Sequence, residues 1–383
     1  MRLLPDKPSM EFLRKQAKDL LVALRETTPG SSLADAQRTL AGEYGMHDWP
    51  TLKAEVDRRN ADAPVAPDGL AEELAAAFGL GRVTDPATPV SFTPMGRSWD
   101  LTTDRGRWLA GAVYPWITPE QAEIGARLRD AALIAGVAAP VAVRSPKGQL
   151  IERVRDEGWR VHEWLEVGPP PVTPVSSAVA RRIGTTYAIL HGLAIPSEAP
   201  ISPYLTWRRA EAEWHQLLDR ARAAGKPWAG QLEALLPEVF ELHKIDADFT
   251  DQELILCNSN LIPSYVRQGR NGELVVTEWD FTGSLTPEFE VAGALTHWGM
   301  RPKTNHKAIV AFREGYLERG EWPKLELASF TLAVTAWLNW TYNAICEAID
   351  PENDERAEFA EREALGLLQW PMTRARLEDL LGA

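Results

Sequence analysis

The stretch LILCNSNLIPSYVRQGRNGELVVTEWDFTG, residues 254–283, decides how the rest of the chain is interpreted. An apolar run typical of a strand leads into a compact polar loop. A second such run, Glu273–Thr277, leads into the acidic turn Glu278–Asp280. Loops that follow short strands are common places for binding and catalytic residues, and these two predict a charged cleft. Its function depends on whether Asn260, Tyr265 and Glu278 can do chemistry there.

Size and charge restrict the class of protein. The 383 residues predict two or three domain-sized units, and a composition of 45% hydrophobic and 25% charged residues is typical of globular chains. The formal net charge of -13 argues against binding to nucleic acid or to anionic membranes. A small cationic ligand or a basic peptide would suit this charge better, although acidic surfaces are also common in proteins without such ligands.

Cysteine content and hydropathy bear on the compartment. Cys257 and Cys346 are the only cysteines, so the sequence predicts neither a disulfide framework nor a zinc site. The N-terminal segment lacks the apolar core of a signal peptide, and no stretch is apolar over the length of a bilayer span. We therefore expect a cytoplasmic protein.

Residues 1–60 predict a small helical module. Apolar residues recur at helical spacing from Leu13 to Leu24, Ser31 or Ser32 can cap a second helix, and Trp49-Pro50 opens a third. The pattern resembles a short helical domain at the front of many bacterial proteins, often before ankyrin repeats, and implies a shape but no activity. A linker rich in Pro, Ala and Asp follows at residues 61–69.

The remaining chain places strands before helices. We expect a hairpin with its turn at Asp104–Gly106, a helix over Pro119–Ala135 and an edge strand from Arg160, within a small antiparallel sheet at residues 70–168. Residues 169–383 are expected to be mainly helical, with helices over 176–193, 205–224, 228–245, 291–299, 307–319, 328–349 and 352–368. This order predicts an α+β protein of two lobes with a cleft between them.

Several motifs in this order resemble those of the aminoglycoside phosphotransferase and choline kinase family. TYAILHGL (186–193) is similar to the family's LAxLHxL helix end. LCNSNLIPSYV (256–266) stands where the family has His-Gly-Asp-Leu-x-Pro-x-Asn, and VTEWDFTG (276–283) where it has Ile-Asp-Trp-x-x-x-Gly. PEFEVA (287–292) resembles the following Pro-x-x-Asp-Leu-Ala. The resemblance covers roughly residues 66–370 and implies a protein-kinase-like two-lobe fold.

The resemblance also assigns site positions, and this sequence departs from the family at most of them. Gly111 falls where a strand lysine would align the nucleotide phosphates, and Glu123 can occupy the place of that lysine's glutamate partner. Asn260 falls on the catalytic aspartate. Tyr265 falls on the metal-binding asparagine, and Glu278 on the metal-binding aspartate. An arginine such as Arg97 or Arg107 can substitute for the missing lysine as a charge.

These departures differ in their chemical cost. A glutamate at 278 can still ligate Mg²⁺, whereas the phenol of Tyr265 is a poor ligand that fills the space of an ion. Asn260 cannot accept a proton as a carboxylate does, and a lost general base typically costs roughly 10²–10⁴-fold in rate. Together they favour a kinase-fold protein that has lost ordinary ATP-dependent phosphotransfer. Such a protein would bind a ligand or a partner protein, or use its cleft for other biosynthetic chemistry.

Two alternatives remain open. The first is an active antibiotic or metabolite phosphotransferase with a rearranged site, in which Asp280 acts as metal ligand or base, and only this reading implies ATP and Mg²⁺. The second is other catalysis by Glu278, Asp280, His191 or Cys257, although His191 at a helix end and Cys257 in an apolar strand also suit purely structural roles. We expect a small-molecule or peptide ligand, with a cleft lined by Gly111, Glu123, Ser259, Tyr265, Trp279, Trp337 and Trp340, although aromatic residues at helical spacing are more often core.

Overall fold

The computed structural model describes residues 4–5, 7–93, 96–249, 252–270 and 272–382. Near the N-terminus it contains the helices α1 (Met10–Thr27), α2 (Leu33–Glu43) and α3 (Trp49–Ala61). Local signals start them: Ser32 and Asp35 form a capping box on α2, and the Asp48 side chain accepts the Thr51 N–H at the start of α3. Leu13, Leu20, Leu40 and Leu52 form their shared core.

A helix that the sequence pattern did not predict, α4 (Leu70–Phe78), follows. It begins after Gly69 and ends at Gly79, both of which have the positive φ that suits glycine. Its apolar face, including Leu74 and Phe78, packs with Trp99 of the sheet into one hydrophobic cluster. This helix therefore covers one face of the sheet.

The sheet is antiparallel, as expected. It contains β1 (Thr88–Thr93), β2 (Gly96–Thr103), β3 (Gly106–Ala112), β4 (Ala142–Val143), β5 (Glu152–Val154) and β6 (Glu157–Glu163). The order is β1-β2-β3-β6-β4, with β5 also on β6. The β2–β3 hairpin is confirmed, but the expectation of an edge strand from Arg160 was wrong, because β6 pairs with β3 on one side and with β4 and β5 on the other.

The remainder is mainly helical, with short strands inserted. The elements are α5 (Pro119–Ile134), which follows β3, and then α6 (Ser177–Gly192), α7 (Pro203–Thr206), α8 (Glu211–Ala223), α9 (Ala229–Leu242), β7 (Ile255–Cys257), η1 (Pro263–Tyr265), β8 (Val266–Gln268), β9 (Leu274–Val276), β10 (Gly283–Leu285), α10 (Pro287–Trp298), α11 (His306–Leu317), η2 (Leu327–Phe330), α12 (Thr331–Ile349), α13 (Asp354–Gln369) and α14 (Arg374–Leu381). Their buried faces share one large core.

The helix expected over Leu205–Ala224 is in fact two, α7 and α8, separated by a non-helical segment. Arg208 in this segment donates to the carbonyls of His243 (2.7 Å) and Ile245 (2.5 Å) and to Thr335 Oγ1 (3.0 Å). Hydrogen bonds from Arg208 to residues distant in sequence therefore stabilise the break between α7 and α8.

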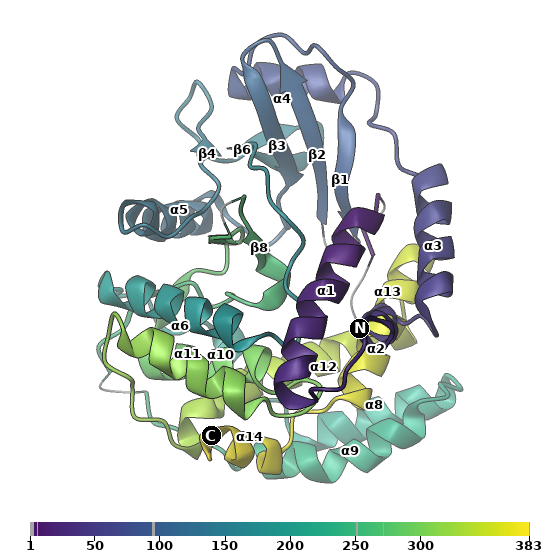
Figure 1. Cartoon of the computed structure of the whole chain (residues 1–383), viewed down its shortest axis with the longest axis vertical. Coiled ribbons are helices and arrows are strands. Elements are labelled where there is room, and N and C mark those ends of the chain that lie inside the picture. Colours follow the sequence, from purple (N-terminus) through teal and green to yellow (C-terminus); the bar gives the residue numbers. More distant parts are fainter. Residues whose placement is uncertain (1–3, 6, 94–95, 250–251, 271, 383) are drawn as a thin grey trace.

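The sheet with α4 forms an upper lobe, and the mainly helical remainder forms a lower lobe (Figure 1). The sheet lobe and the helical lobe are joined by residues 164–176, which link β6 to α6. We call residues 164–176 the interlobe strap. The fold is thus an α+β fold of two lobes with the N-terminal helices added, as expected. Among the described residues, no helix combines the length and apolar character needed to cross a lipid bilayer.

Candidate functional site

The polar loop after β7 and the acidic turn after β9 lie side by side because β10 returns to pair with β7. Gly283 is opposite Cys257 in this pairing. The Asn258 side chain, fully buried, donates to the carbonyl of Glu278 (2.8 Å) and accepts the N–H of Asn260 (3.2 Å). The Asn258 amide therefore joins the loop that carries Asn260 to the turn that carries Glu278 and Asp280.

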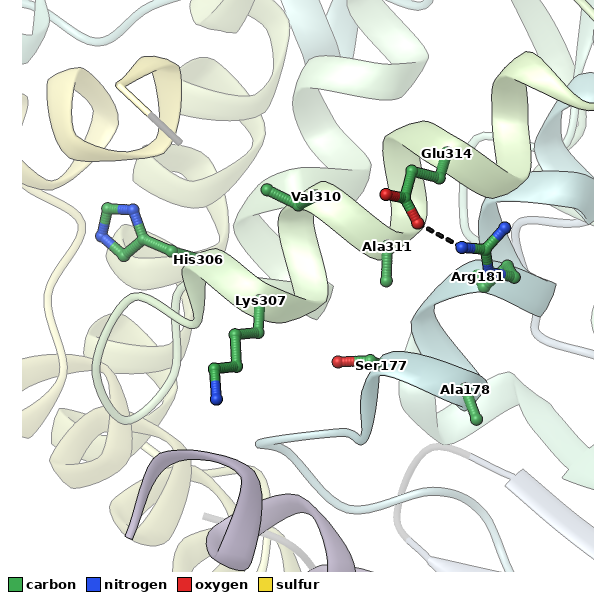
Figure 2. A pocket seen from close by; sticks show the side chains of 8 residues that line it. All are labelled: Ser177, Ala178, Arg181, His306, Lys307, Val310, Ala311 and Glu314. Atoms are coloured by element: carbon green, nitrogen blue, oxygen red, sulfur yellow. Dashed lines mark hydrogen bonds and ion pairs between the residues drawn. The ribbon is translucent and has the colours of Figure 1, made fainter.

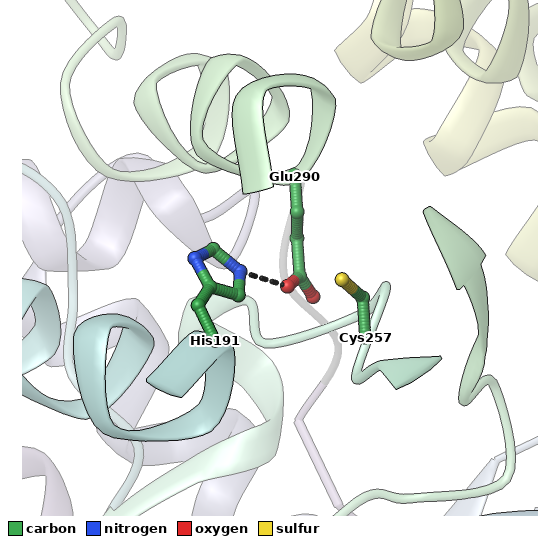
Figure 3. A group of neighbouring side chains, drawn as sticks. All are labelled: His191, Cys257 and Glu290. Atoms are coloured by element: carbon green, nitrogen blue, oxygen red, sulfur yellow. Dashed lines mark hydrogen bonds and ion pairs between the residues drawn. The ribbon is translucent and has the colours of Figure 1, made fainter. Parts of the chain in front are cut away.

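A buried hydrogen-bonded group that contains His191 and Glu290 (Figure 3) supports the loop. Glu290 of α10 accepts the backbone N–H of Ser259 (2.6 Å), and its other oxygen lies 2.6 Å from His191 Nε2. His191 Nδ1 lies 2.8 Å from the Tyr316 hydroxyl. Ser259 needs this support because its φ of 62° is in the left-handed region, which costs a non-glycine residue about 1–2 kcal/mol.

Cys257 completes this group, and its ligand atom lies within 4.8 Å of those of His191 and Glu290. Burial raises the pKa of the Cys257 thiol well above its ordinary value, with the nearby Glu290 adding to the effect. The thiol is fully buried and therefore not a nucleophile. Both carboxylate oxygens of Glu290 already have hydrogen-bond partners, so the group positions the loop and does not need a metal ion.

The acidic turn is internally bonded and paired with one cation. Glu278 Oε1 accepts the backbone N–H groups of Trp279 (2.9 Å) and Asp280 (2.8 Å). Its Oε2 lies 3.5 Å from the Arg160 guanidinium, which also forms an ion pair with Asp280 Oδ1. Burial raises the pKa of Glu278, although Arg160 opposes the shift. The second oxygen of Asp280, Oδ2, is buried without a hydrogen-bond partner among the described residues.

Arg160 reaches the turn from β6, the strand next to β3, on which Gly111 falls where the resemblance places the family's lysine. Gly111 of β3 and Arg160 of β6 are directly opposite in the antiparallel register, so their side-chain positions share one face of the sheet. The suggested substitutes lie elsewhere: Arg97 pairs with Glu157, and Arg107 pairs with Asp100 and Glu166. The cation beside the acidic turn is instead Arg160, which binds carboxylates of the protein itself.

Aromatic side chains occupy the space beside this ion pair. The phenol of Tyr114, which follows β3, hydrogen-bonds with that of Tyr265, and burial raises the pKa of both. Tyr114 stacks on the exposed Trp116, with ring centroids 5.0 Å apart. Its ring centroid lies 6.1 Å from that of Phe281, with the two rings tilted against each other. A Cβ atom on Gly96, where β2 begins, would lie 3.7 Å from the Tyr114 ring. The Tyr114 ring therefore lies between the start of β2 and Phe281, next to the acidic turn.

Helix α5 is fixed directly to the acidic turn. The Gln121 side chain donates to the carbonyls of Asp280 (2.8 Å) and Thr282 (2.7 Å). A Cβ atom at Gly125 would overlap the Trp279 carbonyl, so this close approach requires glycine. Glu123, on the same helix, instead pairs with Arg144, with both side chains about half exposed (48% and 46%). Glu123 is thus paired with an arginine and not with a strand lysine.

Between α5, β6 and the turn is a cavity of about 20 Å³, lined by residues that include Arg129, Arg160, His162 and Asp280. Burial lowers the pKa of His162 well below 6.5, so its ring is neutral at pH 7. A volume of this size holds about one water molecule. The space beneath the turn therefore does not admit a larger ligand in this conformation.

The predicted tryptophans divide between core and surface. Trp279 is buried, and its Nε1 donates to the Val276 carbonyl (3.0 Å). Trp337 lies in the main hydrophobic core, so its place in the cleft lining was wrong; the core alternative holds for it. Trp340 is 36% exposed and donates to Glu363 of α13 (3.3 Å).

Sequence reasoning missed Arg160, Gln121 and Tyr114, three residues that contact the acidic turn or Phe281 beside it. For Arg160 a signal existed: Arg160 and His162 alternate with the buried Trp159 and Val161, which places a cation on the opposite face of the strand. For the other two, the sequence offers no comparable pattern.

No protein-family model and no curated protein sequence matches the chain. Solved structures do. A spectinomycin phosphotransferase in complex with ADP and spectinomycin has a TM-score of 0.57 at 12% identity, over 83% of this chain and 98% of that one. An aminoglycoside phosphotransferase from Alicyclobacillus acidocaldarius has a TM-score of 0.52 at 16% identity, over 84% and 97%. A microcompartment-associated aminopropanol kinase has a TM-score of 0.51 at 14% identity, over 82% and 98%. These likenesses establish that the chain has an aminoglycoside-phosphotransferase-like kinase fold.

Proposed function

We propose that this chain is a kinase-fold binding protein that has lost ordinary Mg²⁺- and ATP-dependent phosphotransfer. The observation that carries the proposal is the ion pair of Arg160 with both Glu278 and Asp280. A phosphotransferase uses carboxylates at this turn to hold Mg²⁺ against the nucleotide phosphates. Here a guanidinium, which never deprotonates, already neutralises one of the two negative charges.

The residues present do not fit Mg²⁺ as they are arranged. Mg²⁺ demands near-octahedral oxygen ligands at about 2.0–2.1 Å. One oxygen of Glu278 accepts two backbone N–H groups, while its other oxygen and Asp280 Oδ1 face Arg160. Tyr265 replaces the amide ligand and is hydrogen-bonded to Tyr114. We therefore derive no reaction step through a metal ion.

The ligand we propose is a small molecule or a peptide segment that carries positive charge, or a partner protein, and not nucleic acid. The acidic net charge of -13 and the exposed ring of Trp116 beside Tyr114 support this choice. A cleft reused for other biosynthetic chemistry fits the same residues.

One observation favours the alternative of an active phosphotransferase. Asp280 Oδ2 is buried without a hydrogen-bond partner, and such an atom is costly to leave unpaired. A movement of Arg160 would release Asp280 Oδ1 and Glu278 Oε2 together, and both carboxylate oxygens of Asp280 would then be free to bind an ion. In that case Asp280 and Glu278 would be metal ligand and base, and the Asp280→Asn and Glu278→Gln variants would abolish turnover.

Calorimetry with ATP, in the presence and absence of Mg²⁺, tests the proposal. We expect that Mg²⁺ adds nothing to any nucleotide binding by the wild type and that no phosphate reaches hydroxyl- or amine-bearing substrates. The Arg160→Met variant should gain Mg²⁺ binding, visible as a thermal shift, whereas the matched surface variant Arg144→Met should not. Turnover at an ordinary enzymatic rate that depends on Asp280 would establish the alternative instead.

A further inference from the structure

The N-terminal helices contact the interlobe strap directly. Figure 1 shows α1 beside the connection from β6 to α6. The buried side chain of Gln16 donates to the carbonyl of Pro170 (2.8 Å) and accepts from the Tyr44 hydroxyl (3.2 Å). Val172 of the strap belongs to the hydrophobic cluster of α1–α3. The middle of the strap is therefore packed into the core of the N-terminal module.

A second contact holds the end of the strap. The Glu26 carboxylate, near the end of α1, accepts the backbone N–H of Ser177 (3.1 and 3.0 Å) and its hydroxyl (2.7 Å). A carboxylate at a helix N-terminus is favoured by the helix dipole and by charge-assisted hydrogen bonds. Lys307 of α11 also donates to the Glu26 carbonyl. Ser177 and Lys307 line a groove of about 430 Å³ between α6 and α11, beside this contact (Figure 2).

The opposite side of the strap is bound to the helical lobe. The Gly168 N–H donates to the carbonyl of Gln268 on β8 (2.6 Å), and the Val175 carbonyl accepts from the Asn305 side chain (3.1 Å). Strand β8 directly follows η1, which carries Tyr265. The strap is thus held between the N-terminal module and the β8–β9 hairpin, which directly follows Tyr265.

We infer that the N-terminal module is a clamp that, by holding the strap, fixes the spacing of the two lobes. The interface is intramolecular: the partner surface for α1 is the strap and the start of α6. The clamp would act in the free protein, whether or not the cleft transfers phosphate.

Hydrogen exchange followed by mass spectrometry on the full-length protein tests the clamp. The variants are Glu26→Ala and Gln16→Met, which act at different ends of the strap, so that failure of one to fold leaves the other. Glu11→Ala, a change of an exposed glutamate on the same helix, is the matched control. The informative amides are those of 164–168 and of the β8–β9 hairpin, because neither set contacts the substituted side chains.

We expect exchange of these amides to become about 10-fold faster in both variants, or more, as the loss of a charge-assisted or buried hydrogen bond predicts. The control should match the wild type. Faster exchange at 177–180 alone, with unchanged rates at 164–168 and in the hairpin, would show that Glu26 only caps α6 and would overturn the clamp.

Discussion

Replacing Arg160 by methionine tests how the acidic turn is held. Methionine keeps much of the volume of arginine and removes its charge. The side chains of Glu278 and Asp280 are only 7% and 6% exposed, and that of Arg160 is 21% exposed. Removing one partner of a buried ion pair typically costs about 3–5 kcal/mol. Because Glu278 keeps its two backbone N–H bonds, we expect the free energy of unfolding to fall by about 3 kcal/mol at pH 7.

The loss should depend on pH, and its sign follows from proton linkage. Burial already raises the pKa of Glu278 above 4.5 in the wild type, and removal of the arginine, which opposes that shift, should raise it further. A carboxyl whose pKa is higher in the folded state binds more protons folded than unfolded between those two pKa values. Stability then falls as pH rises through that window. The destabilisation of Arg160→Met should therefore be larger at pH 7 than at pH 5.

Urea unfolding followed by tryptophan fluorescence at pH 5, 6 and 7 measures both quantities. Arg144→Met is the control, because its pair with Glu123 is about half exposed and such pairs contribute about 0–1 kcal/mol. If the two variants lost equal stability at pH 7, or if the loss for Arg160→Met did not change between pH 5 and 7, the turn would not depend on this cation. The electrostatic reasoning would then fail.

Two further predictions concern the frame around the site. Gly184→Ala should destabilise the protein by about 3 kcal/mol or more, because its Cβ would overlap the carbonyl of Phe312 where α6 crosses α11. The control is Gly192→Ala, in the same helix, where a Cβ meets open space and the cost should be less than about 1 kcal/mol. Equal thermal midpoints for the two variants would refute the close crossing. Glu290→Gln should lower the free energy of unfolding by about 2 kcal/mol, because an amide binds His191 and the loop N–H less strongly than a carboxylate does. Urea unfolding midpoints measure this loss, and a midpoint equal to that of the wild type would contradict the supporting role of Glu290.

The parts of the fold that were predictable are those with local physical causes. Helices α2 and α3 start at the side-chain caps Ser32 and Asp48. Both helices were predicted, α2 from a cap at Ser31 or Ser32 and α3 from Trp49-Pro50. Helix α4 has glycines at both ends and no side-chain cap bond, and it was missed. The break between α7 and α8 was missed because Arg208, which stabilises it, bonds groups from 35 to 127 residues away in sequence.

The same distinction applies to the site. The loop and the turn were located correctly because they follow strands within one short stretch. The cation was not, because a substitute was sought near Gly111 in sequence, whereas Arg160 is its neighbour only through the pairing of β3 with β6. Strand register between segments about fifty residues apart is a tertiary property. Trp337 shows the opposite error, since an aromatic stripe on a helix was assigned to the cleft and belongs to the core.

If the site positions are those that the resemblance assigns, the contacts between the lobes account for several departures from a phosphotransferase together. In a phosphotransferase the strand lysine points a positive charge at the nucleotide, and the carboxylates of the turn recruit a metal ion. Here the strand position is Gly111, and the positive charge lies on the paired strand, at Arg160, bonded to those carboxylates. Tyr265 then stands at the position of the amide ligand and is hydrogen-bonded to Tyr114. Each change reinforces the others, because a built-in cation makes a metal ion redundant and an absent metal makes room for a phenol. Replacing Arg160 alone therefore frees the carboxylates but leaves the phenols of Tyr265 and Tyr114 in place. Recovery of phosphotransfer would require at least Tyr265→Asn as well.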